Sequence, residues 1–118
     1  MTAKREIAER KGREAEAQAA QWLMQKGWQV VAERVKTKLG EIDLVARRPG
    51  MVAFIEVKWR KRAADLADAI DQHRLSRVAA AVEAVAHEYA NDGEDITIDV
   101  ILLAPGHRPR HIENAWMP

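Results

Sequence analysis

The apolar positions change their period along the chain and predict an alternation of helices and strands. Residues 5–26 carry apolar side chains at helical spacing, which predicts a first helix that ends at Gly27. Its inward face is formed by Ala15, Ala19, Trp22 and Leu23. Residues 71–91 carry a second helical face, with Asp71 as the N-cap. That face is formed by Leu75, Val78, Val82, Val85 and Tyr89.

Short apolar runs elsewhere predict β-strands. They cover residues 28–35, 41–46, 51–59 and 96–103, and residues 111–116 could form a short last strand. Residues 36–40 are predicted to be a basic loop, and residues 63–70 an Ala- and Asp-rich connection. The link at residues 47–50 is short and rich in turn formers, so the strands on either side should pair as an antiparallel hairpin. The order α-β-β-β-α-β-β predicts an α/β fold with a mixed sheet.

Length and composition limit the class of protein. A chain of 118 residues predicts a single domain over residues 1–118. Cysteine is absent, which excludes disulfides and cysteine-based zinc sites. The charged N-terminal sequence has no apolar core of a secretory signal, and no run is long enough to span a membrane. The expected location is the cytoplasm.

Charge is distributed unevenly although the net charge is only +1. Residues 34–62 hold nine Lys or Arg against three Asp or Glu, whereas residues 63–99 hold nine acids against two bases. This distribution predicts that one part of the surface is basic and another acidic; the alternative is that these charges are ordinary solvated ones.

Acidic and basic side chains interrupt the two central apolar runs. Because strand side chains alternate between faces, Glu56 and Lys58 share one face of their strand. Pairing Ala46 with Met51 sets Asp43 diagonal to Glu56 on that face, and pairing Arg47 with Val52 sets the carboxylates directly opposite, with β-carbons about 5 Å apart. A slip by one residue would separate them.

Two carboxylates so close repel each other unless a cation or a proton joins them. Lys58 supplies one positive charge, and a hard divalent ion such as Mg²⁺, which prefers oxygen ligands, would supply more. The alternative is a partly buried Glu56–Lys58 ion pair at a strand end. Glu16 lies at the rim of the first helix's inward face, either as a ligand or paired with a nearby base. Glu41 could equally be a metal ligand or form a salt bridge with Lys38.

Other chemistries find little support. Ser76, the single serine, lies within the second helix and outside any Gly-x-Ser-x-Gly motif. No phosphate-binding loop and no dinucleotide-binding fingerprint is present. His107 and His111 are separated by Pro109, so no helix aligns them as a metal pair. Trp59 could stack on a base, but a place in the core is the simpler interpretation for all the tryptophans.

Several segments together resemble the YraN-like family of small bacterial proteins. In chain order they are GREAEAQAAQWL, GEIDLVA, FIEVKWR, AIDQHR, DVILLA and HIENAW. The resemblance covers about residues 10–116, and GEIDL followed by EVK-x-R is fairly specific at this spacing. It implies the restriction-endonuclease-like PD-(D/E)xK fold, a three-layer α/β/α architecture that is also found in archaeal Holliday-junction resolvases.

The resemblance also implies roles for individual residues. Asp43 matches the metal-binding aspartate, Glu56 and Lys58 the Glu-x-Lys pair, and Glu16 the helical glutamate of such sites. Arg60 matches a basic residue of the family, and Arg74 stands where relatives usually have lysine. The connection at residues 63–70 lacks a glycine that is typical there. The implied cofactor is Mg²⁺ or Mn²⁺.

Three functions are therefore compared. The first is a Mg²⁺-dependent nuclease that hydrolyses DNA, either branched DNA or DNA selected by its structure. Such a nuclease could act as a homodimer. The second is a nucleic-acid-binding module of the same fold with little catalysis, and the third is a scaffold whose acidic second helix docks a protein. The intact carboxylates and lysine favour the first. Candidate phosphate contacts are Lys36, Lys38, Arg47, Arg48, Arg60, Lys61, Arg62 and Arg74.

Overall fold

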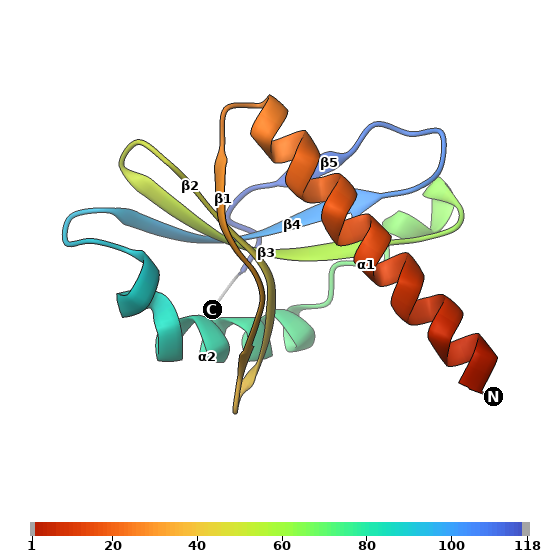
Figure 1. The fold of residues 1–118 in the computed structure, drawn as a ribbon, viewed down its shortest axis with the longest axis horizontal. Coiled ribbons are helices and arrows are strands. Elements are labelled where there is room, and N and C mark those ends of the chain that lie inside the picture. Colours follow the sequence, from red (N-terminus) through yellow and green to blue (C-terminus); the bar gives the residue numbers. More distant parts are fainter. Residues whose placement is uncertain (1, 117–118) are drawn as a thin grey trace.

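A five-stranded sheet lies between two helices in the computed structural model, which describes residues 2–116 (Figure 1). The helices are α1 (Thr2–Gln25) and α2 (Gln72–Tyr89), with a 3₁₀ turn η1 (Ala63–Leu66) before α2. The strands are β1 (Gln29–Thr37), β2 (Gly40–Arg48), β3 (Met51–Trp59), β4 (Asp95–Leu103) and β5 (Arg110–Ile112). Within residues 2–116 no helix is both long enough and apolar enough to cross a membrane.

The strands lie in the sheet in chain order. Neighbours pair antiparallel except for β3 and β4, which are parallel because η1 and α2 carry the chain back between them. The sheet is therefore mixed, and the predicted order α-β-β-β-α-β-β is confirmed. Figure 1 shows α1 and α2 on opposite sides of the sheet, which gives three layers and confirms the α/β class.

Two apolar clusters, one for each helix, fill the space between the layers. Phe54 packs in the cluster that includes Leu75 and Val78 of α2, whereas the next residue, Ile55, packs in the cluster that includes Leu23 of α1. Residues 52–56 are all buried, as the near-continuous apolar run predicts for a central strand covered on both sides. The face of Phe54, on which Glu56 and Lys58 also lie, is thus the α2 face.

The predicted basic loop at residues 36–40 is mostly strand. β1 continues to Thr37, and β2 begins at Gly40. The Thr37 hydroxyl closes the turn, since it accepts the N–H groups of Leu39 and Gly40 and donates to the Gly40 carbonyl. Gly40 packs so closely on α2 that a β-carbon there would lie 3.2 Å from the Arg77 carbonyl oxygen. This contact draws the tip of the β1–β2 hairpin over α2 (Figure 1).

The last strand is shorter than the predicted range of residues 111–116. β5 ends at Ile112, because Asn114 adopts a left-handed conformation with φ of 54°. The Asn114 N–H donates to the carboxylate of Asp99 on β4, and the Ala115 N–H donates to the Ile98 carbonyl oxygen. The chain therefore turns into the end of β4 instead of extending the sheet.

Candidate active site

β2 and β3 separate at the point where the predicted carboxylates meet. Their register pairs Arg47 with Val52 and ends at Leu44 opposite Ile55, so its continuation would set Asp43 directly opposite Glu56. Beyond that point the Asp43 carboxylate replaces a backbone partner: its Oδ2 accepts the Val57 N–H at 2.8 Å. Of the two registers considered from sequence, the directly opposed one is correct, and the separation opens the edge of β3.

Glu56 is the buried centre of the charges on this edge. Its carboxylate Oε1 lies 3.0 Å from Lys58 Nζ and 3.1 Å from Arg74 Nε. The side chains of Glu56 and Lys58 are only 5% and 13% exposed, whereas Arg74 on α2 is 61% exposed. The ion pair that was the simpler alternative from sequence is thus present. Although Arg74 also pairs with Glu56, most of its side chain remains exposed and can contact a ligand.

Asp43 carries the clearest electrostatic perturbation. Burial, and then the negative charge of Glu56, raise the pKa of Asp43 from 3.8 to about 7. Glu16 and Glu41 add to this rise, and the hydrogen bond from Val57 opposes it. An ionised Asp43 is therefore disfavoured, first by its burial and then by the neighbouring carboxylates. A bound cation would relieve that strain, as would a proton.

Glu16 reaches the same site from α1. Its carboxylate Oε1 accepts a hydrogen bond from Arg34 Nε at 3.1 Å, so the nearby base expected from sequence is Arg34 of β1. Arg34 has a positive φ of 52° beside Asp43 in the hairpin. A cleft of about 380 Å³, here called the acidic cleft, connects Glu16 with Asp43 and Glu56. It is lined by Glu16, Gly40, Glu41, Asp43, Glu56, Arg74, Arg77 and Val78.

The predicted phosphate contacts other than Arg74 fall into three groups. Lys36, Lys38, Lys61 and Arg62 are exposed, and Lys36 lines a second hollow beside Glu16 and Arg34. Arg60 is half-buried and donates to the Trp59 carbonyl oxygen. Arg47 and Arg48 lie at the other end of β2, where they bind Glu94 and Glu113. The structure does not bring those two arginines to the acidic cleft.

A separate group of side chains on the α1 face could also hold a metal ion. Asp99, His111 and Glu113 each offer a ligand atom, and these atoms lie within 4.8 Å of one another. It is the one group of three His, Asp or Glu side chains in residues 2–116 that meets this spacing. Asp99 is fully buried and hydrogen-bonded to His111 Nε2 at 2.8 Å. Sequence reasoning missed the group, although DVILLA and HIENAW contain all of its members.

Comparison with known proteins decides the family. The sequence model of the Uncharacterised protein family UPF0102 matches residues 15–103. The chain belongs to the UPF0102 family. A UPF0102 protein of Erythrobacter litoralis is 68% identical over 115 residues, which cover 98% of this chain and 99% of the relative. A UPF0102 protein of Sphingopyxis alaskensis is 56% identical over 97% of this chain and 98% of the relative. A UPF0102 protein of Rhizorhabdus wittichii is 52% identical over 96% of each chain.

The UPF0102 match confirms the family that the sequence segments resemble. Its range contains Glu16, Asp43, Glu56 and Lys58, and it ends before His111 and Glu113. The acidic cleft therefore lies wholly within the region that the family model covers, whereas the Asp99 group lies partly outside it.

Arg47 is expected to stabilise the fold of this UPF0102 protein without contributing to ligand binding. Its guanidinium donates to both carboxylate oxygens of Glu94 at 2.6 Å and to the Tyr89 carbonyl oxygen at 3.0 Å, and the hydrogen bond from Arg47 lowers the pKa of Glu94. Arg47→Met should lower the thermal midpoint by about 5 °C at neutral pH. Nucleic-acid affinity, measured by fluorescence anisotropy, should not change.

The pH dependence gives the control for that variant. A carboxyl group with a lowered pKa stabilises the folded state above its unfolded pKa, and this contribution is lost as pH falls. The difference in midpoint between Arg47→Met and wild type should therefore shrink below the ordinary glutamate pKa of 4.5. A large loss of nucleic-acid affinity at unchanged stability would contradict this role for Arg47.

Proposed function

We propose that this protein is a metal-dependent nuclease that hydrolyses phosphodiester bonds in DNA, with a preference for branched or otherwise structured DNA. The observation that supports it most is the meeting of the Asp43 and Glu56 carboxylates with the Lys58 ammonium at an open strand edge. Burial first, and the charge of Glu56 second, raise the pKa of Asp43, so a bound cation would favour its ionised form. Phosphodiester hydrolysis needs cations at such a position, because negative charge builds up on the phosphate in the transition state.

The donor set fits Mg²⁺ or Mn²⁺. Mg²⁺ is usually held by one or two carboxylates together with several waters and the phosphates of a substrate. Asp43 and Glu56 would be the direct ligands, and Glu16 would bind through water, since these three do not reach the spacing of a closed three-ligand group. A metal held there supplies Lewis acidity at the phosphate and lowers the pKa of a bound water.

The chain's own side chains would bind and orient the other partners of the reaction. Lys58 Nζ is held beside Glu56, so it is placed to orient the attacking water or to stabilise negative charge on the phosphate. Arg74 would leave Glu56 for a phosphate oxygen, because its side chain is largely exposed. Val57 fixes the orientation of the Asp43 carboxylate through its backbone N–H.

The substrate would be held mainly through its backbone. Further phosphate contacts would come from the exposed Lys36, Lys38, Lys61 and Arg62 and from the half-buried Arg60, all of which lie outside the lining of the acidic cleft. Such contacts give affinity that depends on salt and not on base sequence. We place this reaction in the cytoplasm, where the DNA of a bacterial cell is found.

A second candidate function has an observation of its own. Glu56 is already paired with both Lys58 and Arg74, which is the arrangement expected of a structural ion pair at a strand end. If these pairs persist in the bound state, the protein would be a nucleic-acid-binding module of the same fold with little or no catalysis.

One assay separates the two functions. Labelled duplex, single-stranded and four-way-junction DNA are incubated with the protein and Mg²⁺, and products are resolved on denaturing gels. Wild type should cleave at least one substrate, while Asp43→Asn and Lys58→Ala should cleave about a hundredfold more slowly or less. Asp65→Asn is the matched control, since Asp65 lies outside the lining of the acidic cleft and pairs, among the described residues, with the exposed Arg62.

The outcomes point in different directions. Equal cleavage by wild type, Asp43→Asn and Lys58→Ala would show that the acidic cleft is not the active site. Tight binding without cleavage by the wild type would favour the binding module. Loss of activity in Asp65→Asn as great as in Asp43→Asn would mean that the effect is not specific to the cleft.

A further inference from the structure

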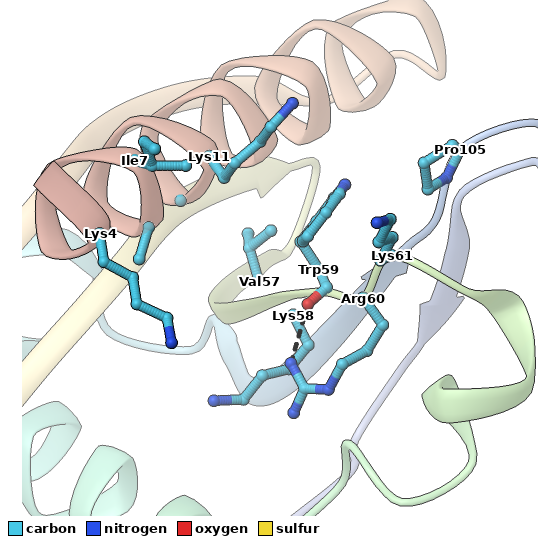
Figure 2. A pocket seen from close by; sticks show the side chains of 11 residues that line it. Lys4, Ile7, Lys11, Val57, Lys58, Trp59, Arg60, Lys61 and Pro105 are labelled. Atoms are coloured by element: carbon cyan, nitrogen blue, oxygen red, sulfur yellow. Dashed lines mark hydrogen bonds between the residues drawn. The ribbon is translucent and has the colours of Figure 1, made fainter.

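An apolar pocket lies beside the acidic cleft on the α1 face of β3, and its side chains are drawn in Figure 2. Its volume is about 760 Å³, within the roughly 300–1,000 Å³ of small-molecule sites. Its apolar lining consists of Ile7, Ala8, Val57, Trp59 and Pro105. Ile7 is 55% exposed, so this part of α1 offers apolar surface that nothing in residues 2–116 covers. We call this cavity the tryptophan pocket.

Cations surround the tryptophan pocket. Among the described residues that line it, none is acidic and five are basic, namely Lys4, Lys11, Lys58, Arg60 and Lys61. Lys11 Nζ lies 5.7 Å from the centroid of the Trp59 ring, although it also reaches Glu14 at 3.7 Å. Figure 2 shows Lys4, Lys11 and Lys61 around the opening, with Val57 and Trp59 between them. An aromatic and apolar interior with a cationic rim matches a planar, uncharged ring attached to phosphate.

The tryptophan pocket and the acidic cleft are separated by the width of one strand. The Val57 side chain lines the pocket, while the Val57 N–H holds the Asp43 carboxylate of the cleft at 2.8 Å. Lys58, the next residue of β3, touches the pocket, but its side chain extends to the α2 face, where its Nζ lies 3.0 Å from Glu56. Because successive residues of a strand point to opposite faces, one nucleotide can meet the pocket with its base and the cleft with its phosphate across the edge of β3.

We propose that the tryptophan pocket binds the base of an unpaired nucleotide next to the phosphate in the acidic cleft. The base would stack on Trp59, and its flanking phosphates would contact Lys4, Lys11 and Lys61. A base inside a continuous duplex is stacked on both faces and paired at its edge, so it cannot enter a pocket unless it leaves the helix. This inference rests on the proposed function and narrows its substrates to DNA with single-stranded ends, flaps or branch points.

Filling the pocket without changing its charge tests the proposal. Ala8→Leu adds bulk to the pocket wall on a helix that tolerates leucine well. Its binding to a fluorescein-labelled oligothymidylate should be about tenfold weaker than that of wild type, as expected from loss of one base-stacking contact. Ala17→Leu is the matched control: the same substitution at an exposed position of α1 that does not line the pocket should leave binding unchanged.

Substitution of the ring gives a second, independent measurement. Trp59→Ala should weaken oligothymidylate binding by about tenfold, and Trp59→Phe should retain most of it, because a smaller aromatic ring still stacks. Since Trp59 also packs against the α1-side cluster, each variant is compared at a temperature where circular dichroism shows it to be folded. Binding to a blunt duplex of the same charge should be nearly the same for Ala8→Leu and wild type.

The contrary results are distinct. Unchanged oligothymidylate binding by Ala8→Leu, or an equal loss for oligothymidylate and duplex, would overturn the proposal. The proposal would also be overturned if a labelled acidic peptide bound the wild type more strongly than oligothymidylate does and displaced it. If the wild type cleaves DNA and Ala8→Leu does not change oligothymidylate binding, the base-binding role of the pocket is wrong and the nuclease proposal stands. If Ala8→Leu weakens oligothymidylate binding but the wild type cleaves no DNA, the base-binding role of the pocket stands and the nuclease proposal is wrong.

Discussion

Replacing Asp43 with asparagine should stabilise the protein above neutral pH. Burial and the charge of Glu56 raise the Asp43 pKa to about 7, so an ionised Asp43 costs free energy in the folded state. The shift corresponds to at most about 4 kcal/mol, and we expect the free energy of unfolding to rise by roughly 2 kcal/mol near pH 8. Asparagine keeps an oxygen that can accept the Val57 N–H, so the geometry at β3 is preserved.

The sign of the pH dependence makes this prediction specific. Between the unfolded pKa of 3.8 and the folded pKa of about 7, the folded protein retains a proton that the unfolded chain has released. The contribution of Asp43 to the stability of the wild type therefore decreases as pH rises through this range and is constant above it. Urea denaturation near pH 8 should show the gain for Asp43→Asn, and near pH 4 the two proteins should differ little.

Metal ions and a control variant complete the Asp43 measurement. Mg²⁺ at a hundredfold excess over its dissociation constant should stabilise wild type by about 2.7 kcal/mol and Asp43→Asn by much less. Asp65→Asn should show neither effect, because its partner Arg62 is 77% exposed and such surface pairs contribute little. A loss of stability in Asp43→Asn near pH 8 would mean that Asp43 is not under electrostatic strain.

Replacing His111 with alanine should destabilise the protein strongly. His111 Nε2 lies 2.8 Å from the carboxylate of Asp99, which is fully buried, and the ring also packs against Trp22 and Trp28. Removing one partner of a buried carboxylate costs roughly 3–5 kcal/mol, because the carboxylate remains desolvated with less compensation. The loss can be measured as a shift of the urea midpoint at neutral pH. His107→Ala, in the exposed loop before β5, should have little effect.

A second substitution shows whether the charge or the packing is responsible. Asp99→Asn in the His111→Ala background removes the uncompensated charge, while Asn114 N–H keeps an oxygen acceptor at position 99. Part of the lost stability should therefore return. No recovery would attribute the loss to the aromatic contacts alone. A rise of the wild-type midpoint with added Zn²⁺ that disappears in His111→Ala would identify the group as a metal site.

The candidate site could be predicted closely from sequence where the signal was local. Alternation along a strand placed Glu56 and Lys58 on one face, and helical spacing placed Glu16 at the rim of α1. The helices were predicted from apolar positions that repeat with the helical period, and the central strands from near-continuous apolar runs. The connection at residues 36–40 was predicted too long, because the Thr37 hydroxyl closes a tight turn and lets both strands continue into it.

Apart from the Glu56–Lys58 pair within one strand, the partners of the charged side chains could not be predicted, because most of the ion pairs join elements that are distant in sequence. The excess of basic residues at positions 34–62 predicted either a basic part of the surface or ordinary solvated charges. In the fold, Arg34 pairs with Glu16, Arg47 with Glu94 and Arg48 with Glu113. The Asp99 group was missed for a similar reason: β4 and β5 become neighbours only when the sheet forms.

The sequence by itself determined the order of the elements, the shared face of Glu56 and Lys58, and the family. Each depends on local periodicity or on residue identity along the chain. Only the tertiary structure decided the register at Asp43, the cations that neutralise Glu56 and the tryptophan pocket beside the site. These depend on where β2 leaves β3 and on how α1 and α2 pack across the sheet, which follow from long-range packing.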